Sequence, residues 1–588
     1  MKIILAHEIG YCLGVRRAMR MAFKALSHAE GKVYSHGPLI HNQAAMDLLQ
    51  SKGLNIYEPN ITQLNKGDTL IVRAHGLPPV EWAKLGALDI KLIDATCPRV
   101  AQIQSLVAKK AKEGYLVIIW GTPRHPEVEG LLGFGDTRAV VVSTVEDILA
   151  LEEQDGEEKV LLVSQTTQDM RAFEAIKEAA VKRFATRLTI KDTICEATLK
   201  RQDEIALLAA KADALVVVGG KDSGNTKRLY QRGLEEGLKT ILVDGPEDIP
   251  EAFTQGVTTV AIGAGASSPI WQIRKVSQKL RALDRLGQSS PMGFIHRLLR
   301  ALVLSRVYIA LGTGSWGYAI NLAMGVDSPK LFFGLFFYFG HAMHILNGYL
   351  DRDSARYNDP DFASFFNKYR VYMILAGFLS LFLSLSAAWL IDTKVFFLAV
   401  ILLALGILYA LPLPFGFLAK RGIRRLKDLP LVKPVAISTG WSLLVTIPLY
   451  LHKPRLINLD THGLMLLIIG FCLSFAQIFV RSFLMEMQDA RGDRIFSSNT
   501  LFARIGINRS TWFLIGFIVL WAIALVTSYF LAGTSAIFLC LILTGPVYNG
   551  LVLKRFFLNP WLGGFEFDLL LDTQFILAGL IALLWTYL

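Results

Sequence analysis

The chain has 588 residues, 53% of them apolar and 19% charged, with a formal net charge of +12. This length predicts more than one domain, and a mean hydropathy of +0.41 argues against a wholly soluble protein. Five cysteines in a chain of this size do not make a disulfide framework, and no nucleic-acid-binding motif accompanies the positive charge.

Residues 1–285 have the pattern of an α/β domain. Apolar runs of strand length alternate with amphipathic helical stretches, and the runs end in glycine or polar residues. The runs are KIILA, DTLIVRAHG, IKLIDA, GYLVIIWG, KVLLVSQTT, LTIKDTI, ADALVVVGG and TTVAIGAG. The first run is too short for a signal peptide, so we expect this domain to stay in the cytoplasm. Residues 286–299, which begin LGQSSPMG, indicate a linker.

Cys12, Cys97 and Cys195 share one local setting in this domain. Each follows an apolar run at a turn and precedes a helical stretch. Helix N-termini favour the thiolate, which is the form that binds metal. The repeated setting therefore predicts three similar lobes that converge on one centre, where three thiolates hold a 4Fe–4S cluster and leave one iron open for substrate. The alternative is three unrelated buried cysteines.

Long apolar segments dominate from residue 300 onward and predict an all-α polytopic membrane domain over residues 300–588, with about nine transmembrane helices. With a cytoplasmic front domain, the loops expected on the cytoplasmic side contain 16 Lys and Arg residues and the opposite loops contain 4. This asymmetry follows the positive-inside rule and explains much of the net charge without nucleic acid. The predicted spans are 301–325, 331–350, 371–391, 395–418, 434–451, 463–485, 511–531, 535–553 and 569–588.

Acidic side chains gather at the predicted cytoplasmic ends of the second and sixth spans, with a basic loop between them. Carboxylates three or four residues apart fall on one face of a helix. Two such clusters could hold Mg²⁺ ions that bridge a diphosphate, and the basic loop could complete the anion site. The alternative is that these charges are solvated caps at helix ends. The candidate residues are Asn347, Asp351 and Asp353 at the end of the second span, Lys420 and Arg421 in the loop, and Asp489 and Asp493 just after the sixth span.

The first 280 residues contain a series of short motifs: GYCLGVRRA, GPLIHN, RAHG, DATCP, RHPEVEG, SQTT, DTICEAT, VVGGKDSGNTKRL and GAGASSP. In this order they resemble the hydroxymethylbutenyl diphosphate reductases of the LytB (IspH) family. The resemblance implies three α/β lobes around a 4Fe–4S cluster. It also implies reductive removal of an allylic hydroxyl to give isopentenyl and dimethylallyl diphosphates, with electrons from a ferredoxin or flavodoxin-like donor.

The same resemblance implies roles for single residues. Glu127 matches the proton-delivering glutamate of the family, and Thr166 matches a threonine near the substrate hydroxyl. In one departure, Gly224 stands where the family usually has a second serine, which removes one hydroxyl contact to the phosphate. The residues that match the diphosphate-binding positions are His41, His75, His125, Ser223, Asn225 and Ser267.

The rear half resembles the UbiA superfamily of membrane prenyltransferases across about residues 300–588. The segment DARGDR at 489–494 is close to the second aspartate motif of that superfamily, and Tyr409 with the basic loop after it resembles its basic loop. The first motif is degenerate, because Gly348 and Ala355 replace two acids. The resemblance implies Mg²⁺ on a prenyl diphosphate and an allylic cation that an unidentified acceptor traps.

Together the two resemblances predict a bifunctional, multi-pass enzyme of the cell membrane whose partners are prenyl diphosphates, an electron donor and lipid, but not nucleic acid. One alternative is a membrane-tethered iron–sulfur sensor or electron carrier, which would have no need for Glu127 or Thr166. Another is a working reductase whose rear half is a non-catalytic anchor, binding or transport module.

Overall fold

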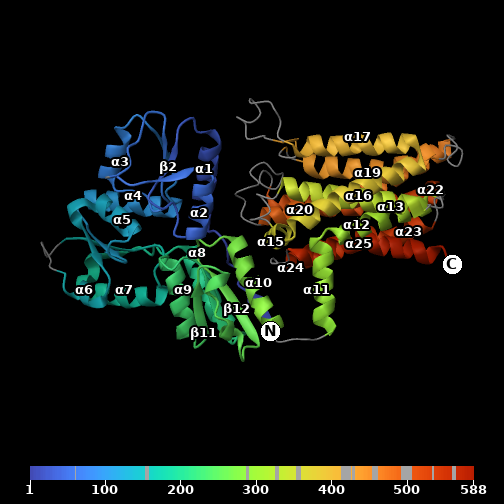
Figure 1. Ribbon diagram of the computed structural model, residues 1–588. Helices are drawn as coiled ribbons and strands as arrows, with labels where there is room; N and C mark the ends of the chain where they lie inside the picture. The colour runs from blue at the N-terminus through green and yellow to red at the C-terminus, as the bar shows by residue number, and fades with distance from the viewer. Residues whose placement is uncertain are drawn as a thin grey trace. The chain divides into compact units, whose positions relative to one another are not determined.

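The computed structural model describes residues 1–587 apart from Asn60, Pro430 and the segments 152–157, 287–290, 325–329, 352–358, 412–424, 427–428, 453–460, 492–505, 533–535 and 559–563. The chain divides into two compact units, Met1–Gln288 and Ser289–Leu588 (Figure 1).

The first unit contains three parallel four-stranded sheets. Their strand orders are β11-β10-β12-β1, β3-β2-β4-β5 and β7-β6-β8-β9. If β1 is counted as the fourth strand of its sheet, the three orders are the same, so this unit is a threefold repeat. The first lobe contains β10, β11, β12 and β1, the second contains β2 to β5, and the third contains β6 to β9. Strand β1 therefore completes the first lobe. The strands are β1 (Lys2–Leu5), β2 (Val33–His36), β3 (Leu54–Tyr57), β4 (Thr69–Val72), β5 (Lys91–Asp94), β6 (Leu116–Trp120), β7 (Ala139–Val142), β8 (Val160–Ser164), β9 (Leu188–Ile190), β10 (Ala214–Val218), β11 (Lys239–Val243) and β12 (Thr259–Ala264).

The three-lobed α/β architecture predicted from the sequence is confirmed, and every apolar run named above is a strand. The structure adds β2, β3, β7 and β11. Strand β2 has the sequence VYSH, and its buried Ser35 and His36 break the apolar pattern that identifies the other strands.

The helices of the first unit cover the sheets and pack through apolar cores. In the third lobe, Trp120 of β6 stacks on Phe173 with 5.2 Å between ring centroids, and both side chains are buried. The helices are α1 (Leu13–His28), α2 (Gln43–Ser51), α3 (Pro79–Gly86), α4 (Pro98–Lys112), α5 (Pro126–Gly135), α6 (Val145–Leu149), α7 (Met170–Phe184), α8 (Glu196–Ala209), α9 (Gly224–Glu235) and α10 (Ile270–Leu286), with 3₁₀ turns η1 (Asp136–Arg138), η2 (Ala185–Arg187), η3 (Pro246–Asp248) and η4 (Glu251–Thr254).

The second unit is helical throughout its described residues. Its elements are α11 (Pro291–Leu304), α12 (Val307–Ala323), α13 (Lys330–Leu350), α15 (Pro360–Lys368), α16 (Arg370–Ile391), α17 (Thr393–Ala410), α19 (Val432–His452), α20 (Thr461–Arg491), α22 (Ile507–Ala532), α23 (Ile537–Ile542), the π-helical turn η6 (Leu543–Val547), α24 (Tyr548–Leu558) and α25 (Phe565–Trp585). Helix α11 occupies most of the predicted linker and packs against α12, α15 and α25. Pro291 is tolerated there because its missing N–H belongs to the first turn.

Six of the described helices are long and apolar enough to cross a membrane: α16, α17, α19, α20, α22 and α25. The remaining three predicted spans correspond to α12, α13 and the run from α23 to α24. Of these, α12 has only 17 residues, and the last run is interrupted by η6 around Pro546. That all nine cross the membrane stays a prediction.

Large apolar side chains on the outer helices point away from the helical core. Phe378 and Phe382 on α16 and Trp512 and Phe530 on α22 are at least two-thirds exposed in the protein alone. Such surfaces are unfavourable in water and suit contact with lipid tails. The buried polar groups of this unit, described below, lie inside it.

Candidate active sites

The three cysteines lie where the fourth strand of each lobe ends. Cys12 follows β1, Cys97 follows β5 and Cys195 follows β9, and each is the N-cap residue of the next helix, α1, α4 or α8. All three line one cavity of about 120 Å³. Because the carboxyl ends of parallel strands carry these turns, three equivalent lobe edges bring the thiols to one place.

Each cysteine turn is fixed by a backbone bond from outside its own strand. The N–H groups of Cys12, Cys97 and Cys195 donate to the carbonyls of Ala266 (3.0 Å), Ala74 (2.9 Å) and Thr166 (2.9 Å). The turns are therefore positioned by the sheets before any cofactor binds.

The residues present fit a cluster with three thiolate ligands. Burial raises the pKa of the Cys97 thiol, the neighbouring cysteines raise it further, and the N–H groups of Arg99 and Val100 oppose this shift. Metal binding would displace the thiol proton. A Cβ placed on Gly14 would lie 2.6 Å from Cys97 Sγ, so glycine at the start of α1 keeps the thiol cradle open.

Three histidines form a cluster at the same cavity. The ring centroids of His41 and His75 are 4.8 Å apart, those of His75 and His125 5.5 Å, and those of His41 and His125 5.9 Å. Burial lowers the pKa of all three, with mutual repulsion and the Arg73 charge as further causes, and His125 falls to about 4. The imidazoles are therefore neutral near pH 7, and each can donate an N–H to an anion.

Glu127 and Thr166 form a buried pair in this cavity. The Thr166 N–H donates to Glu127 Oε1 at 2.7 Å, and its hydroxyl donates to Oε2 at 2.9 Å. Burial raises the pKa of the Glu127 carboxyl, although both bonds from Thr166 oppose the rise. A carboxyl held in this way can carry a proton at a pH where an exposed glutamate has lost it.

The predicted diphosphate-binding side chains line the same cavity. Ser223 is the N-cap of α9, and Ser267 Oγ donates to the His41 carbonyl at 2.9 Å. Asn225 is buried, and neither polar atom of its side chain has a partner among the described residues. A buried amide with both ends unpaired indicates a missing ligand. At Gly224 a Cβ would meet only Thr167, at 3.7 Å, so glycine is not required by space there.

Sequence reasoning missed the cations around this cavity. Arg73 lies beside the histidines and lowers their pKa, yet it stands in the quoted motif RAHG without having been singled out. Arg17 of α1 donates to the carbonyls of Asp94 and Thr96, just before Cys97. Nothing in the local pattern distinguishes Arg17 from an ordinary surface arginine.

The second unit encloses a mainly apolar cavity of about 480 Å³. Its wall includes Asn347, one of the predicted Mg²⁺ ligands, and Tyr409, from the predicted basic-loop region. Two further polar groups, His344 of α13 and Arg481 of α20, also line it. The cavity can therefore hold a long apolar molecule with a polar end.

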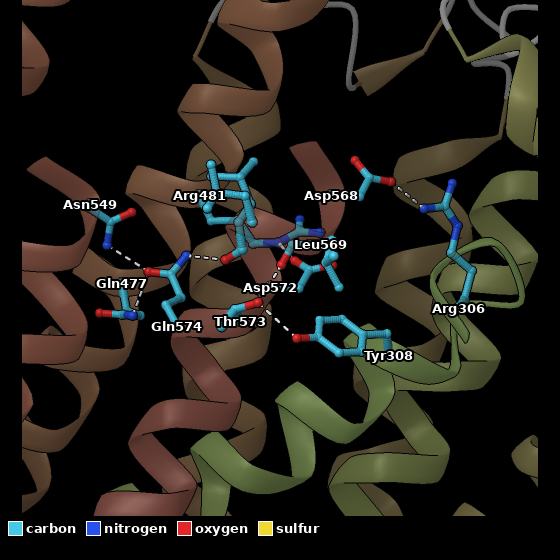
Figure 2. Close-up of polar contacts among 12 residues, drawn as sticks. Arg306, Tyr308, Gln477, Arg481, Asn549, Asp568, Leu569, Asp572, Thr573 and Gln574 are labelled. Carbon is cyan, nitrogen blue, oxygen red and sulfur yellow. Dashed lines mark hydrogen bonds and ion pairs between the residues drawn. The ribbon is translucent and has the colours of Figure 1, made fainter. Parts of the chain in front are cut away.

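Helix α25 carries two buried acids that pair with partly buried arginines from other helices of this unit (Figure 2). Arg481 Nε donates to Asp572 Oδ1 at 2.6 Å, and Arg306 Nη1 donates to Asp568 Oδ2 at 2.9 Å. Two residues after Asp572, Gln574 Oε1 accepts bonds from Gln477 and Asn549, both at 2.6 Å. The sequence analysis did not single out any of these residues, because the partners are far apart in the chain.

Most predicted Mg²⁺ and basic-loop residues cannot be placed. Asp353, Lys420, Arg421 and Asp493 lie outside the described residues, and Asp489 is described only as part of α20. Asp351 is described, and its Oδ1 accepts a bond from Arg425 Nη1 at 2.8 Å. The first acidic cluster is thus joined to the segment predicted as its basic partner.

Comparison with known proteins gives matches for the first half of the chain. A family model described as LytB protein matches residues 3–281. The 4-hydroxy-3-methylbut-2-enyl diphosphate reductase of Aquifex aeolicus is 38% identical over 285 residues, which are 48% of this chain and 96% of that protein. The reductase of Geobacter metallireducens is 36% identical, with 48% and 98% covered.

Solved structures give weaker likenesses. A reductase described as the terminal enzyme of the non-mevalonate pathway is 36% identical and covers 48% of this chain and all of its own, with a TM-score of 0.38. The Plasmodium falciparum reductase is 26% identical, covers 50% and 89%, and has a TM-score of 0.45. A digeranylgeranylglyceryl phosphate synthase is 18% identical, covers 49% and 96%, and has a TM-score of 0.32.

Substituting Gly14 by alanine tests the thiol cradle. The added Cβ would lie 2.6 Å from Cys97 Sγ, so we expect anaerobically reconstituted Gly14→Ala to retain much less iron and sulfide per chain than wild type. Gly86→Ala is the matched control, because a Cβ there meets nothing within 4 Å and the site is also helical. Equal iron content in all three proteins would contradict this account of Gly14.

The histidine cluster predicts proton uptake when an anion binds. A diphosphate beside the imidazoles favours their charged form, so the lowered pKa values should rise on binding. Calorimetry of inorganic diphosphate binding near pH 6, in buffers of different ionisation enthalpy, should show protons taken up. His125→Gln should take up fewer, and undiminished uptake by this variant would show that the protons go elsewhere.

Proposed function

Through its first half the chain belongs to the LytB family of 4-hydroxy-3-methylbut-2-enyl diphosphate reductases, and we propose that this half converts that substrate to isopentenyl and dimethylallyl diphosphates. The observation that carries the proposal is one cavity lined by three N-cap cysteines, three neutral histidines and a buried glutamic acid paired with a threonine. A sensor or electron carrier would have no use for the buried glutamic acid or for the threonine paired with it.

The reaction removes the hydroxyl as water and places one hydrogen on carbon, which takes two electrons and two protons. A 4Fe–4S cluster on the cysteines would supply the electrons, received from a ferredoxin or flavodoxin-like donor, and a Lewis-acidic iron. Glu127 holds the proton that the departing hydroxyl needs. Thr166 orients this carboxyl through both of its bonds and lies where it can contact the same hydroxyl.

The other end of the substrate is held by groups that suit an anion. The neutral histidines offer N–H donors, and Asn225 offers a buried amide without a partner among the described residues. Binding there excludes water from the cavity and sets the hydroxyl at a fixed distance from the thiols. Anchoring a remote group in this way lowers the entropy cost of reaching the reactive geometry.

For the second half we propose Mg²⁺-dependent transfer of a prenyl group from a prenyl diphosphate to an acceptor in the membrane. The large apolar cavity would receive the prenyl chain, and Asn347, Tyr409, His344 and Arg481 provide its polar wall. The acidic motifs of the sequence and the Asp351–Arg425 bond support a charged entrance. Magnesium held by carboxylates would neutralise the leaving diphosphate.

One observation favours the alternative of a non-catalytic membrane module. Gly348 stands where the UbiA pattern has an acid, and a Cβ there would lie 2.5 Å from the ring of Phe362. Phe362 is buried in a core cluster, so the position is closed to a larger side chain. One metal ligand is therefore lost for a packing reason, and the second motif would have to compensate.

Glu127→Gln tests the reductase. We expect this variant to keep the cluster and lose about 10²–10⁴-fold in turnover, because an amide cannot deliver the proton. Wild-type turnover should fall as pH rises through the raised pKa of Glu127, since the protonated carboxyl is the active form. Glu129→Gln, an exposed change in the same helical turn, is the control. Near-normal rates in Glu127→Gln would remove the assigned role.

Asp493→Asn tests the transferase. Host cells that produce wild type, Asp493→Asn or Asp392→Asn are grown anaerobically. The lipids of their membranes are then extracted and compared by mass spectrometry. Asp392 caps α17 at the predicted opposite side, and asparagine preserves such a cap. We expect a prenylated lipid with wild type and Asp392→Asn only. Identical lipids in all three, with folded protein and the native acceptor pool supplied, would favour the non-catalytic module.

A further inference from the structure

A buried arginine lies between two of the cysteine turns. Arg201 of α8 is only 5% exposed. Its Nη1 donates to the carbonyl of Ala197 at 2.9 Å, two residues after Cys195. Its Nη2 donates to the carbonyl of Gly10 at 3.0 Å, two residues before Cys12. The guanidinium therefore connects the Cys195 turn, which follows β9, to the Cys12 turn, which follows β1.

The charge of Arg201 has no carboxylate bonded to it among the described residues. Glu204, an acid on the same helix, instead accepts the backbone N–H groups of His7 and Glu8. Among the groups of opposite charge that act on Arg201, Cys12 acts most strongly, followed by Glu8, Cys195 and Glu204. Burying a cation is costly unless an anion lies close to it, so the thiolates are its natural counter-charge.

We propose that Arg201 is a positioning residue that stabilises the more negative, reduced state of the cluster held by Cys12, Cys97 and Cys195. The proposal rests on the reductase function argued above. A fixed positive charge beside two ligand thiolates favours addition of an electron, because net charge near a cluster is one of the levers that set its potential. Low exposure keeps water and salt from screening that charge.

Arg17 offers a matched comparison within the same chain. It too donates two bonds to backbone carbonyls, those of Thr96 at 2.8 Å and Asp94 at 3.2 Å, and so braces the turn before Cys97. Unlike Arg201 it is partly exposed, and its bond to Asp94 lies at the surface. Replacing Arg17 should thus loosen a cysteine turn with little change in the electrostatics of the cluster.

The test is a redox titration of the full-length chain in detergent, reconstituted anaerobically and followed by electron paramagnetic resonance. We expect Arg201→Gln to lower the equilibrium constant for one-electron reduction on the order of tenfold, which is about 59 mV. Arg201→Lys keeps the charge but cannot reach both carbonyls, so its potential should stay near that of wild type even if less cluster is retained. Arg17→Gln should leave the potential unchanged.

The outcomes distinguish an electrostatic effect of Arg201 on the cluster from a purely structural support of the cysteine turns. An unchanged potential in Arg201→Gln overturns the proposal, and so does an equal shift in Arg201→Lys or Arg17→Gln. If Arg201→Gln holds no cluster, the Arg201→Lys potential decides, because a wild-type value supports the charge and a lowered value refutes it. A wild-type chain that binds no cluster would instead overturn the reductase function itself.

Discussion

Three thiols can meet at one cofactor only if three parts of the chain end at the same point. Parallel sheets meet this constraint, because all strands of a sheet finish at one edge and a helix must begin there to return the chain. In this protein each lobe places its cysteine after its fourth strand, as the cap of a helix. The histidines and the Glu127–Thr166 pair line the same cavity. The three lobes of the first unit are arranged so that these three sheet edges lie together.

Much of the first unit could be predicted from the sequence, because its signals are local. The three cysteines follow recognisable strands, and the histidines stand in short motifs that contain glycine or proline. The roles of Arg17 and Arg201 could not be predicted, because each depends on carbonyls up to 191 residues away. Strand β2 was missed because its buried Ser35 and His36 interrupt the apolar pattern, so its own sequence does not look like a core strand.

In the second unit the sequence predicts apolar helices well and their polar interior poorly. Asp568 lies in the first turn of α25, where it resembles the helix-end charges of any membrane protein, and Asp572 lies one turn further along the helix. The structure pairs them with Arg306 and Arg481 from other helices (Figure 2). Ionisable groups inside a membrane domain persist when paired or lining a cavity, and Arg481 does both. Only the three-dimensional arrangement separates such residues from solvated caps.

The closure of the first lobe by β1 has a consequence for the making of the protein. Lys2 to Leu5 pair with Thr259 to Ile262, so β1 has no partner until roughly 250 residues later in the chain. At about 5–20 residues per second, the ribosome leaves β1 and Cys12 waiting roughly 10–50 s. Helix α12 follows only a short stretch after β12. The sheet that carries Cys12 is therefore completed only after β12 has been synthesised, so most of the first unit is made before its thiol centre can form.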